Sequence, residues 1–375
     1  MEAPFPRPGE VFEDRYRIDS EIGTGGFARI FLANEEGIDR KVAIKVLKSA
    51  LNEGATQGDD KALKVAERFK REARLVAKLR DPHTITMFDH GQTDDGLLYM
   101  VFEYIDGESL RQVARRQAPL DGQRLVHILE QTLSSLQEAH AVGVLHRDIK
   151  PANIMLYEHV GREDQVKVLD FGIAKAVMSD ATRTAQDLTG DGTIIGTPRY
   201  MAPEQLRGDE TGSMTDIYSL GLVAYELLTG QKANAAESTI SVITRQVSMP
   251  SFEVPRGIDI PVGLRSIVDG MLLKDAQKRF QTTDDVMDAL EDWDADEVVG
   301  AKAEWLEAEE TEEDLDDYPT IPIESDAADL EAGEPATESG EPATESAEGT
   351  PETAAIARGE SSSSDADGTW AEGPS

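Results

Sequence analysis

One short stretch of the sequence concentrates side chains that can accept, donate or neutralise charge. It reads His146-Arg-Asp-Ile-Lys-Pro-Ala-Asn153 and holds an acid, two bases and an asparagine within eight residues. A carboxylate next to bases is the kind of set that general acid–base chemistry needs. A second acid follows in Asp170-Phe-Gly172, 22 residues after Asp148.

A glycine cluster near the N-terminus, Ile22-Gly-Thr-Gly-Gly-Phe-Ala-Arg-Ile30, is suited to binding phosphates. Backbone amides approach a phosphate closely only where side chains are absent. The cluster departs from the pattern G-x-G-x-x-G, because Ala28 holds the place of the third glycine. A glycine-rich hairpin turn that binds no nucleotide is the alternative interpretation.

A lysine inside an apolar strand is the next candidate. In Val42-Ala-Ile-Lys45 the buried ammonium group of Lys45 needs a counter-ion, because losing its hydration is costly. Glu72, on a predicted helix, can supply the carboxylate. A lysine at the edge of the strand that faces water is the alternative.

These residues need elements that hold them in place. The first 104 residues are strand-rich, with predicted strands at 16–22, 28–33, 41–47 and 97–104. Apolar residues at helical spacing predict a helix over 61–79. From about Ile105 the pattern is mostly helical, apart from a strand–turn–strand pattern around 154–156 and 166–169. Residues 217–228 are apolar nearly all round, which predicts a buried helix.

The order and spacing of five motifs resemble the signature set of the eukaryotic-type (Hanks-type) serine/threonine protein kinases. The fifth motif is Ala202-Pro-Glu204, whose glutamate lies 34 residues after Asp170. The resemblance covers about residues 16–290 and is greatest to soluble bacterial Ser/Thr kinases. It implies an α+β fold with two lobes, a β-rich N-lobe with one regulatory helix and a mainly α-helical C-lobe.

The expected domain bounds follow from this resemblance and from composition. They are an N-terminal extension at 1–15, the N-lobe at 16–104, the C-lobe at 105–292 and a disordered acidic tail at 293–375.

The resemblance also implies roles for single residues. Asp148 accepts or orients the proton of the attacking hydroxyl, and Lys150 steadies the γ-phosphate of ATP. Lys45 contacts the α- and β-phosphates and pairs with Glu72. The metal ligands for Mg²⁺ (or Mn²⁺) are Asn153 and Asp170. The ATP-binding set is Ile22, Gly23, Thr24, Gly25, Gly26, Phe27, Ala28, Arg29, Ile30, Ala43, Lys45, Glu103, Ile105 and Met155.

The resemblance also implies a gatekeeper residue and three structural residues. Phe102 takes the gatekeeper position at the start of the hinge that holds adenine by backbone hydrogen bonds. Glu204 and Arg279 match a buried ion pair of the C-lobe, and Asp216 matches the acid that anchors the catalytic loop. His146 is interpreted as a packed structural residue and not as a base.

The implied function is transfer of the γ-phosphoryl group of ATP to Ser or Thr hydroxyls of protein substrates, in signal transduction. Lys150, two residues after Asp148, is the Ser/Thr-type arrangement, and the segment 196–204 resembles the Ser/Thr version. Two alternatives stay open. One is a pseudokinase scaffold, which Ala28 favours, and the other is a small-molecule kinase on a related fold.

Activation is expected to depend on phosphorylation of the loop before Gly196. By family spacing, Arg68 and Lys175 converge on Arg147, and three cations in one pocket repel each other until an anion arrives. The predicted autophosphorylation sites are Thr189 and Thr193.

The charge balance limits the partners. The chain has 73 acidic and 37 basic residues, a net charge of −36, and residues 295–375 hold 25 acids against 2 bases. Nucleic acids and anionic membranes need Lys and Arg, so we expect neither as a partner. There are no cysteines, no signal-peptide pattern and no apolar run long enough to span a membrane, so we expect a cytoplasmic protein.

The tail has two interpretations. The simpler one is a self-repelling extension without a specific partner. The other begins from Thr311 and Thr320, which are followed three residues later by Asp314 and Ile323. Once phosphorylated, these threonines would resemble the ligands of a phosphothreonine-binding (forkhead-associated) partner.

Overall fold

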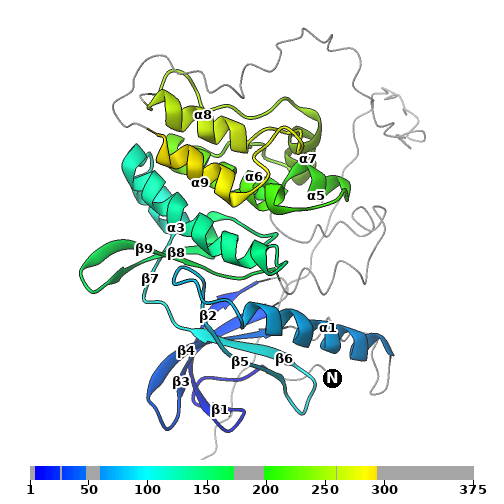
Figure 1. Ribbon diagram of the computed structural model, residues 1–375. Helices are drawn as coiled ribbons and strands as arrows, with labels where there is room; N and C mark the ends of the chain where they lie inside the picture. The colour runs from blue at the N-terminus through cyan, green and yellow to red at the C-terminus, as the bar shows by residue number, and fades with distance from the viewer. Residues whose placement is uncertain (1–4, 26–27, 48–59, 173–197, 259, 294–375) are drawn as a thin grey trace, which may run out of the picture. The chain divides into compact units, whose positions relative to one another are not determined.

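The computed structural model describes residues 5–25, 28–47, 60–172, 198–258 and 260–293 (Figure 1), and only the backbone of 60–65. They all belong to one unit, Met1–Tyr318, and the second unit, Pro319–Ser375, lies outside the described residues. Among the described helices, none has the length and apolar character that crossing a membrane requires.

The N-terminal part is built on a six-stranded antiparallel sheet in the order β1-β2-β3-β4-β6-β5. Side chains alternate across a strand, so Val42, Ile44 and Val46 of β4 all point into one apolar layer that contains Tyr16 and Phe31. The strands are β1 (Val11–Phe12), β2 (Tyr16–Thr24), β3 (Ala28–Glu35), β4 (Arg40–Leu47), β5 (Met87–Gln92) and β6 (Leu98–Glu103).

Helix α1 (Asp60–Val76) lies beside this sheet and contacts β5 (Figure 1). Its residues Phe69, Ala73 and Val76 are buried at helical spacing, which explains why the apolar pattern predicts this helix. The helix carries Glu72 on its partly exposed side.

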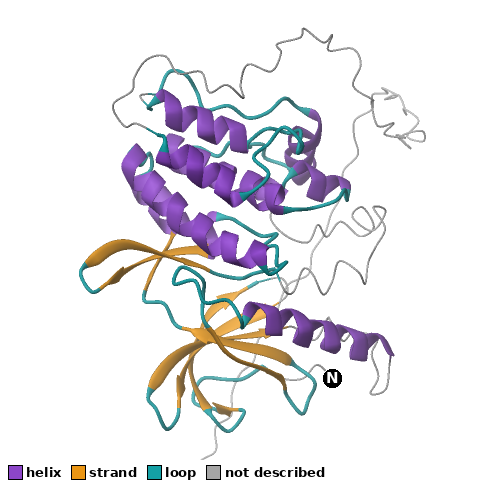
Figure 2. Cartoon of the chain, in the orientation of Figure 1, coloured by secondary structure: helices purple, strands orange, loops and turns teal. Residues whose placement is uncertain are grey.

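The C-terminal part is mainly helical, as the resemblance implies, and it begins with a small three-stranded sheet in the order β7-β8-β9 (Figure 2). The strands are β7 (Gly107–Ser109), β8 (Ile154–His159) and β9 (Arg162–Val168). The helices are α2 (Leu110–Gln117), α3 (Gly122–Ala141), α5 (Pro203–Arg207), α6 (Ser213–Thr229), α7 (Thr239–Ser248), α8 (Val262–Met271) and α9 (Thr283–Glu291), with short 3₁₀ turns at η2 (Pro151–Asn153) and η3 (Pro198–Tyr200).

Helix α6 contains the apolar run 217–228, and most of its side chains are buried. It packs against α3 and α8, so the expected core helix is present. Its N-terminal turn carries Asp216, which is fully buried and faces the loop between α3 and η2. Because α6 is buried, it holds the Asp216 carboxylate in a fixed position next to the predicted catalytic loop.

Two segments differ from the expected bounds. Val11 and Phe12 pair with β2 as a sixth strand, although this segment was expected to be an extension. At the other end Trp293, expected in the tail, packs on the helical core and lies close to Gly122 and Gly263. Val11 and Phe12 form a local hairpin with Arg17 and Tyr16, whereas Trp293 and Gly122 are far apart in the sequence, so the local pattern gives no sign of the second contact.

Candidate active site

The predicted catalytic loop brings three polar side chains together. The Asp148 carboxylate accepts a hydrogen bond from Lys150 Nζ at 2.8 Å and another from Asn153 Nδ2 at 3.1 Å. Asn153 also donates to the Asp148 carbonyl oxygen at 2.9 Å. The η2 turn that follows Lys150 places the lysine and the asparagine on the same carboxylate. Asp148 is therefore held in one orientation with a cation beside it.

Asp216 anchors this loop from below. Its carboxylate accepts the backbone N–H groups of His146 at 2.8 Å and Arg147 at 2.7 Å, and it also bonds His140 Nε2 at 2.8 Å. Burial opposes ionisation, but the hydrogen bond and charge of His140, with a further contribution from His146, hold the pKa of Asp216 below its usual value. Arg147 has a φ of 59°, a conformation that these bonds stabilise.

His146 is a structural residue, as interpreted from the sequence. Its Nε2 lies 2.8 Å from the Leu169 carbonyl oxygen, so it donates there and carries the proton, and Nδ1 then accepts the Asp148 N–H at 3.3 Å. The ring is fully buried, and burial lowers its pKa. A neutral imidazole is required for this pair of hydrogen bonds.

The segment around Asp170 is held against the catalytic loop. The Leu169 N–H donates to the Asn153 carbonyl oxygen at 2.8 Å, and the Gly172 N–H donates to the His146 carbonyl oxygen at 3.0 Å. A Cβ at Gly172 would stand 2.7 Å from that carbonyl, so a larger residue would separate the two segments. The two predicted metal ligands, Asn153 and Asp170, are thereby brought to neighbouring positions.

The partner of Lys45 differs from the expectation. Lys45 Nζ forms an ion pair with Asp170 Oδ1 at 2.7 Å, and the described residues contain no ion pair between Lys45 and Glu72. Glu72 is one-fifth exposed and lies 3.8 Å from Arg71 on its own helix. In this conformation Lys45 therefore pairs with the acid two residues after β9 and not with Glu72 of α1.

The predicted ATP-binding residues lie mainly on the sheet. Ile22, Gly23 and Thr24 end β2, and the Gly25 N–H donates to the Ala28 carbonyl oxygen at 2.9 Å, which closes the hairpin towards β3. Arg29 and Ile30 continue on β3, whereas Gly26 and Phe27 lie outside the described residues.

Strand register joins this hairpin to Lys45 and to the predicted hinge. Ile30 pairs with Lys45, and Ala43 pairs with Phe102, next to Glu103 at the end of β6. Ile105 is partly buried just after that strand, and Met155 lies on β8 opposite Lys167 of β9. The six-stranded sheet therefore brings together most of the described residues of the predicted ATP-binding set, and β8 carries Met155.

The buried ion pair expected in the C-lobe is present. Arg279 Nη1 lies 2.8 Å from Glu204 Oε1, and both side chains are almost completely buried. Thr215 donates to the same carboxylate at 3.0 Å, and Arg279 also donates to the Met214 carbonyl oxygen at 2.6 Å. The pair thereby joins the helix α5 to the start of α6, beside Asp216.

The predicted activation and tail sites belong to parts of the chain that the structure does not describe. Lys175, Thr189 and Thr193 lie outside the described residues, as do Thr311 and Thr320. Arg147, the centre of the expected cation pocket, is described, and its Nε is buried without a hydrogen-bond partner.

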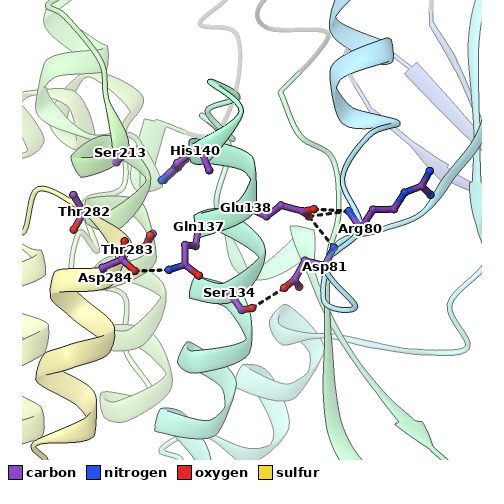
Figure 3. A pocket seen from close by; sticks show the side chains of 11 residues that line it. Arg80, Asp81, Ser134, Gln137, Glu138, His140, Ser213, Thr282, Thr283 and Asp284 are labelled. Carbon is purple, nitrogen blue, oxygen red and sulfur yellow. Dashed lines mark hydrogen bonds between the residues drawn. The ribbon is translucent and has the colours of Figure 1, made fainter.

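A polar cavity of about 720 Å³ lies apart from the predicted residues (Figure 3). On one side, Glu138 of α3 accepts the backbone N–H groups of Arg80 and Asp81, and on the other Gln137 donates to Asp284 of α9. Sequence reasoning missed this cavity, because its walls come from segments that only the fold brings together. None of the predicted nucleotide-binding residues lines it.

The donors near Asp170 suit a hard divalent cation. Among the described residues there is no group of three His, Cys, Asp or Glu that could hold a metal by itself. Magnesium in phosphoryl-transfer sites usually takes only one or two protein ligands together with phosphate oxygens and water. The Asp170 carboxylate and the Asn153 amide oxygen fit this requirement.

Comparison with known proteins identifies the class. A family model for the protein kinase domain matches residues 16–290. The chain therefore belongs to the protein kinase family, and its N-terminal sheet and helical C-terminal part are the two lobes of that fold. A crystal structure of a double mutant of the Mycobacterium tuberculosis PknI kinase domain shares this fold, with a TM-score of 0.58 and 24% identity over 77% of this chain and 98% of that one.

The curated relatives are bacterial. The chain is 38% identical over 240 residues to the serine/threonine-protein kinase Pkn3 of Myxococcus xanthus, which covers 64% of this chain and 42% of that protein. It is 34% identical over 289 residues to PknA of Mycobacterium tuberculosis, which covers 76% of this chain and 62% of PknA. The chain thus spans about two-fifths to three-fifths of the length of these relatives.

Proposed function

We propose that this protein is a serine/threonine protein kinase that transfers the γ-phosphoryl group of ATP to protein hydroxyls. The observation that carries the proposal is the catalytic loop, in which Lys150 and Asn153 both bond the carboxylate of Asp148. The names of the relatives support Ser/Thr substrates, and Lys150 beside Asp148 is the Ser/Thr-type arrangement.

In the proposed mechanism the side chains act mainly by positioning ATP and the acceptor hydroxyl and by stabilising charge. Magnesium, when bound with ATP, neutralises charge on the phosphates, and Asp170 and Asn153 would hold it. Asp148 orients the acceptor hydroxyl and takes its proton, and Lys150 balances the charge that develops on the transferred group. The glycine hairpin Gly23–Gly25 covers the phosphates, and the main chain of 103–105 holds the adenine. Manganese is a second candidate for the same oxygen donors.

The Lys45–Asp170 ion pair supports a two-state site. In this conformation Lys45 bonds the acid that is the predicted metal ligand, and it forms no ion pair with Glu72. Kinase activity requires both the lysine–glutamate pair and a metal-bound aspartate. Activation therefore involves an exchange in which Lys45 leaves Asp170 for Glu72. Phosphorylation of Thr189 or Thr193 is the proposed trigger.

The test is an assay with labelled ATP, magnesium and a generic basic protein, followed by phosphoamino-acid analysis of the product. We expect phosphoserine or phosphothreonine. Absence of transfer despite nucleotide binding would support the pseudokinase alternative, and a labelled small molecule would support the other one. A cytoplasmic location, the absence of nucleic acid from the partners and a forkhead-associated partner at the tail stay predictions.

A further inference from the structure

A buried lysine outside the predicted catalytic set links the two lobes. Lys167 lies on β9 between Val166 and Val168, and its side chain is 9% exposed. Its Nζ lies 2.7 Å from Glu103 Oε1 at the end of β6. A buried ammonium group needs close acceptors, so this contact fixes both side chains.

The ion pair is part of a larger network around the segment 83–86. Lys167 Nζ also donates to the Thr84 carbonyl oxygen at 3.2 Å, and Glu103 Oε1 accepts the Thr86 N–H at 2.8 Å. The Glu103 N–H in turn donates to the Thr86 carbonyl oxygen at 2.9 Å. The segment therefore lies between β9 and the end of β6 and is hydrogen-bonded to both.

Backbone hydrogen bonds complete the connection to β9. The Val168 N–H donates to the His83 carbonyl oxygen at 2.7 Å, and the Ile85 N–H donates to the Val168 carbonyl oxygen at 3.0 Å. Two residues after Val168 the chain reaches Asp170. The network thus joins β9, which leads to the predicted metal ligand Asp170, with β6, which leads to the predicted adenine-binding hinge.

We propose that Lys167 is a positioning residue for ATP, which sets the hinge 103–105 through the carboxylate of Glu103. This inference rests on the proposed function and deepens it. Because that carboxylate is engaged by Lys167 and Thr86, Glu103 serves the nucleotide through its main chain. Without the lysine, the carboxylate of Glu103 loses the cation that pairs with it, and the hinge loses this side-chain connection to β9.

The central experiment compares Lys167→Met with the wild-type protein in steady-state kinetics with ATP and a peptide. Lys167→Met keeps most of the length of the side chain and removes the charge. We expect the KM for ATP to rise about tenfold, as the loss of a charge-assisted hydrogen bond predicts, with the KM for peptide unchanged and kcat within about threefold. Lys167→Arg keeps the charge and should recover most of the affinity for ATP.

A double-variant cycle tests whether the effect passes through Glu103. If it does, adding Glu103→Gln to Lys167→Met should raise the KM for ATP by less than the two single effects multiplied together. Independent, fully multiplying effects would overturn the proposed route. Glu103→Gln also provides a second measurement if Lys167→Met does not fold.

Lys274→Met is the matched control. Lys274 is another partly buried lysine, which donates to the Arg245 and Gln246 carbonyl oxygens in the helical lobe. Its loss should lower the melting temperature and leave the KM for ATP unchanged. An equal rise in the KM for ATP in both variants would mean that the effect is general destabilisation, and the proposal would be wrong.

Direct binding separates this proposal from the proposed function. A fluorescent ATP analogue with magnesium can be titrated into wild type and Lys167→Met without any transfer reaction. Weaker binding by the variant supports the positioning role even if the wild type transfers no phosphate, whereas equal binding sinks it.

Discussion

The catalytic loop and the Lys45 region contrast in how far each is assembled. Asp148, Lys150 and Asn153 already bond one another, and Asp216 holds their loop from a fully buried position. In the other lobe Lys45 bonds Asp170, and Glu72 has no ion pair with it among the described residues. The loop is fixed by buried hydrogen bonds, whereas Lys45 pairs with an acid other than the one that the resemblance implies. The catalytic loop therefore already has its predicted contacts, whereas the predicted Lys45–Glu72 contact is not formed.

The largest expected effect tests the catalytic loop. Asp148→Asn keeps the shape of the side chain but cannot accept a proton, so kcat should fall about 10²–10⁴-fold. The melting temperature should change little, because the amide can still accept from Lys150. Asp209→Asn, at an exposed carboxylate in the same lobe, is the control and should retain wild-type turnover. Substantial turnover by the Asp148 variant would contradict the assigned role.

The second prediction tests the scaffold beneath the loop. Arg279→Met leaves Glu204 buried without its cation, which should lower the free energy of unfolding by about 3–5 kcal/mol. Urea unfolding followed by circular dichroism measures the loss. The matched control is Arg116→Met, which removes an exposed ion pair with Glu108 and should cost about 1 kcal/mol or less. Equal losses in the two variants would show that burial does not set the strength of the pair.

The third prediction tests the proposed exchange of Lys45 from Asp170 to Glu72. Glu72→Gln weakens the partner that Lys45 needs for activity, so kcat/KM should fall roughly 10–100-fold, the range of a charged hydrogen bond. Stability should stay the same, because the Lys45–Asp170 ion pair does not involve Glu72. Glu67→Gln, on the exposed side of the same helix, is the control. If the two variants were equally active, Lys45 would not exchange its acid during activation.

The smallest expected effect concerns pH and His146. In the folded protein, burial lowers the pKa of His146 below its ordinary value of 6.5. Below pH 6.5 the unfolded chain therefore binds a proton that the folded chain does not, and stability falls as the pH falls. His146→Phe removes this titration, although it also removes two hydrogen bonds. Unfolding free energies at pH 7.5, 6.5 and 5.5 should show a steeper loss in the wild type, and parallel slopes would contradict a buried neutral histidine.

The sequence alone determined much of this protein, because its motifs are local. The residues of the catalytic loop lie within one short stretch, so their proximity hardly depends on the rest of the chain. Helix α1, the strands β2 to β4 and the buried helix α6 follow from apolar periodicity, since each must bury one side or all sides. The class of protein could therefore be predicted before any contact was known.

Only the tertiary structure decided which charges pair. The resemblance implies Glu72 as the partner of Lys45, whereas the structure pairs Lys45 with Asp170, because the pairing depends on where α1 and the segment after β9 lie. Nothing in the sequence marks Lys167 as more than a strand residue, because its partner Glu103 lies 64 positions away and only the fold brings the two together. Burial makes such pairings strong and specific, and burial is a property of the assembled chain and not of any segment within it.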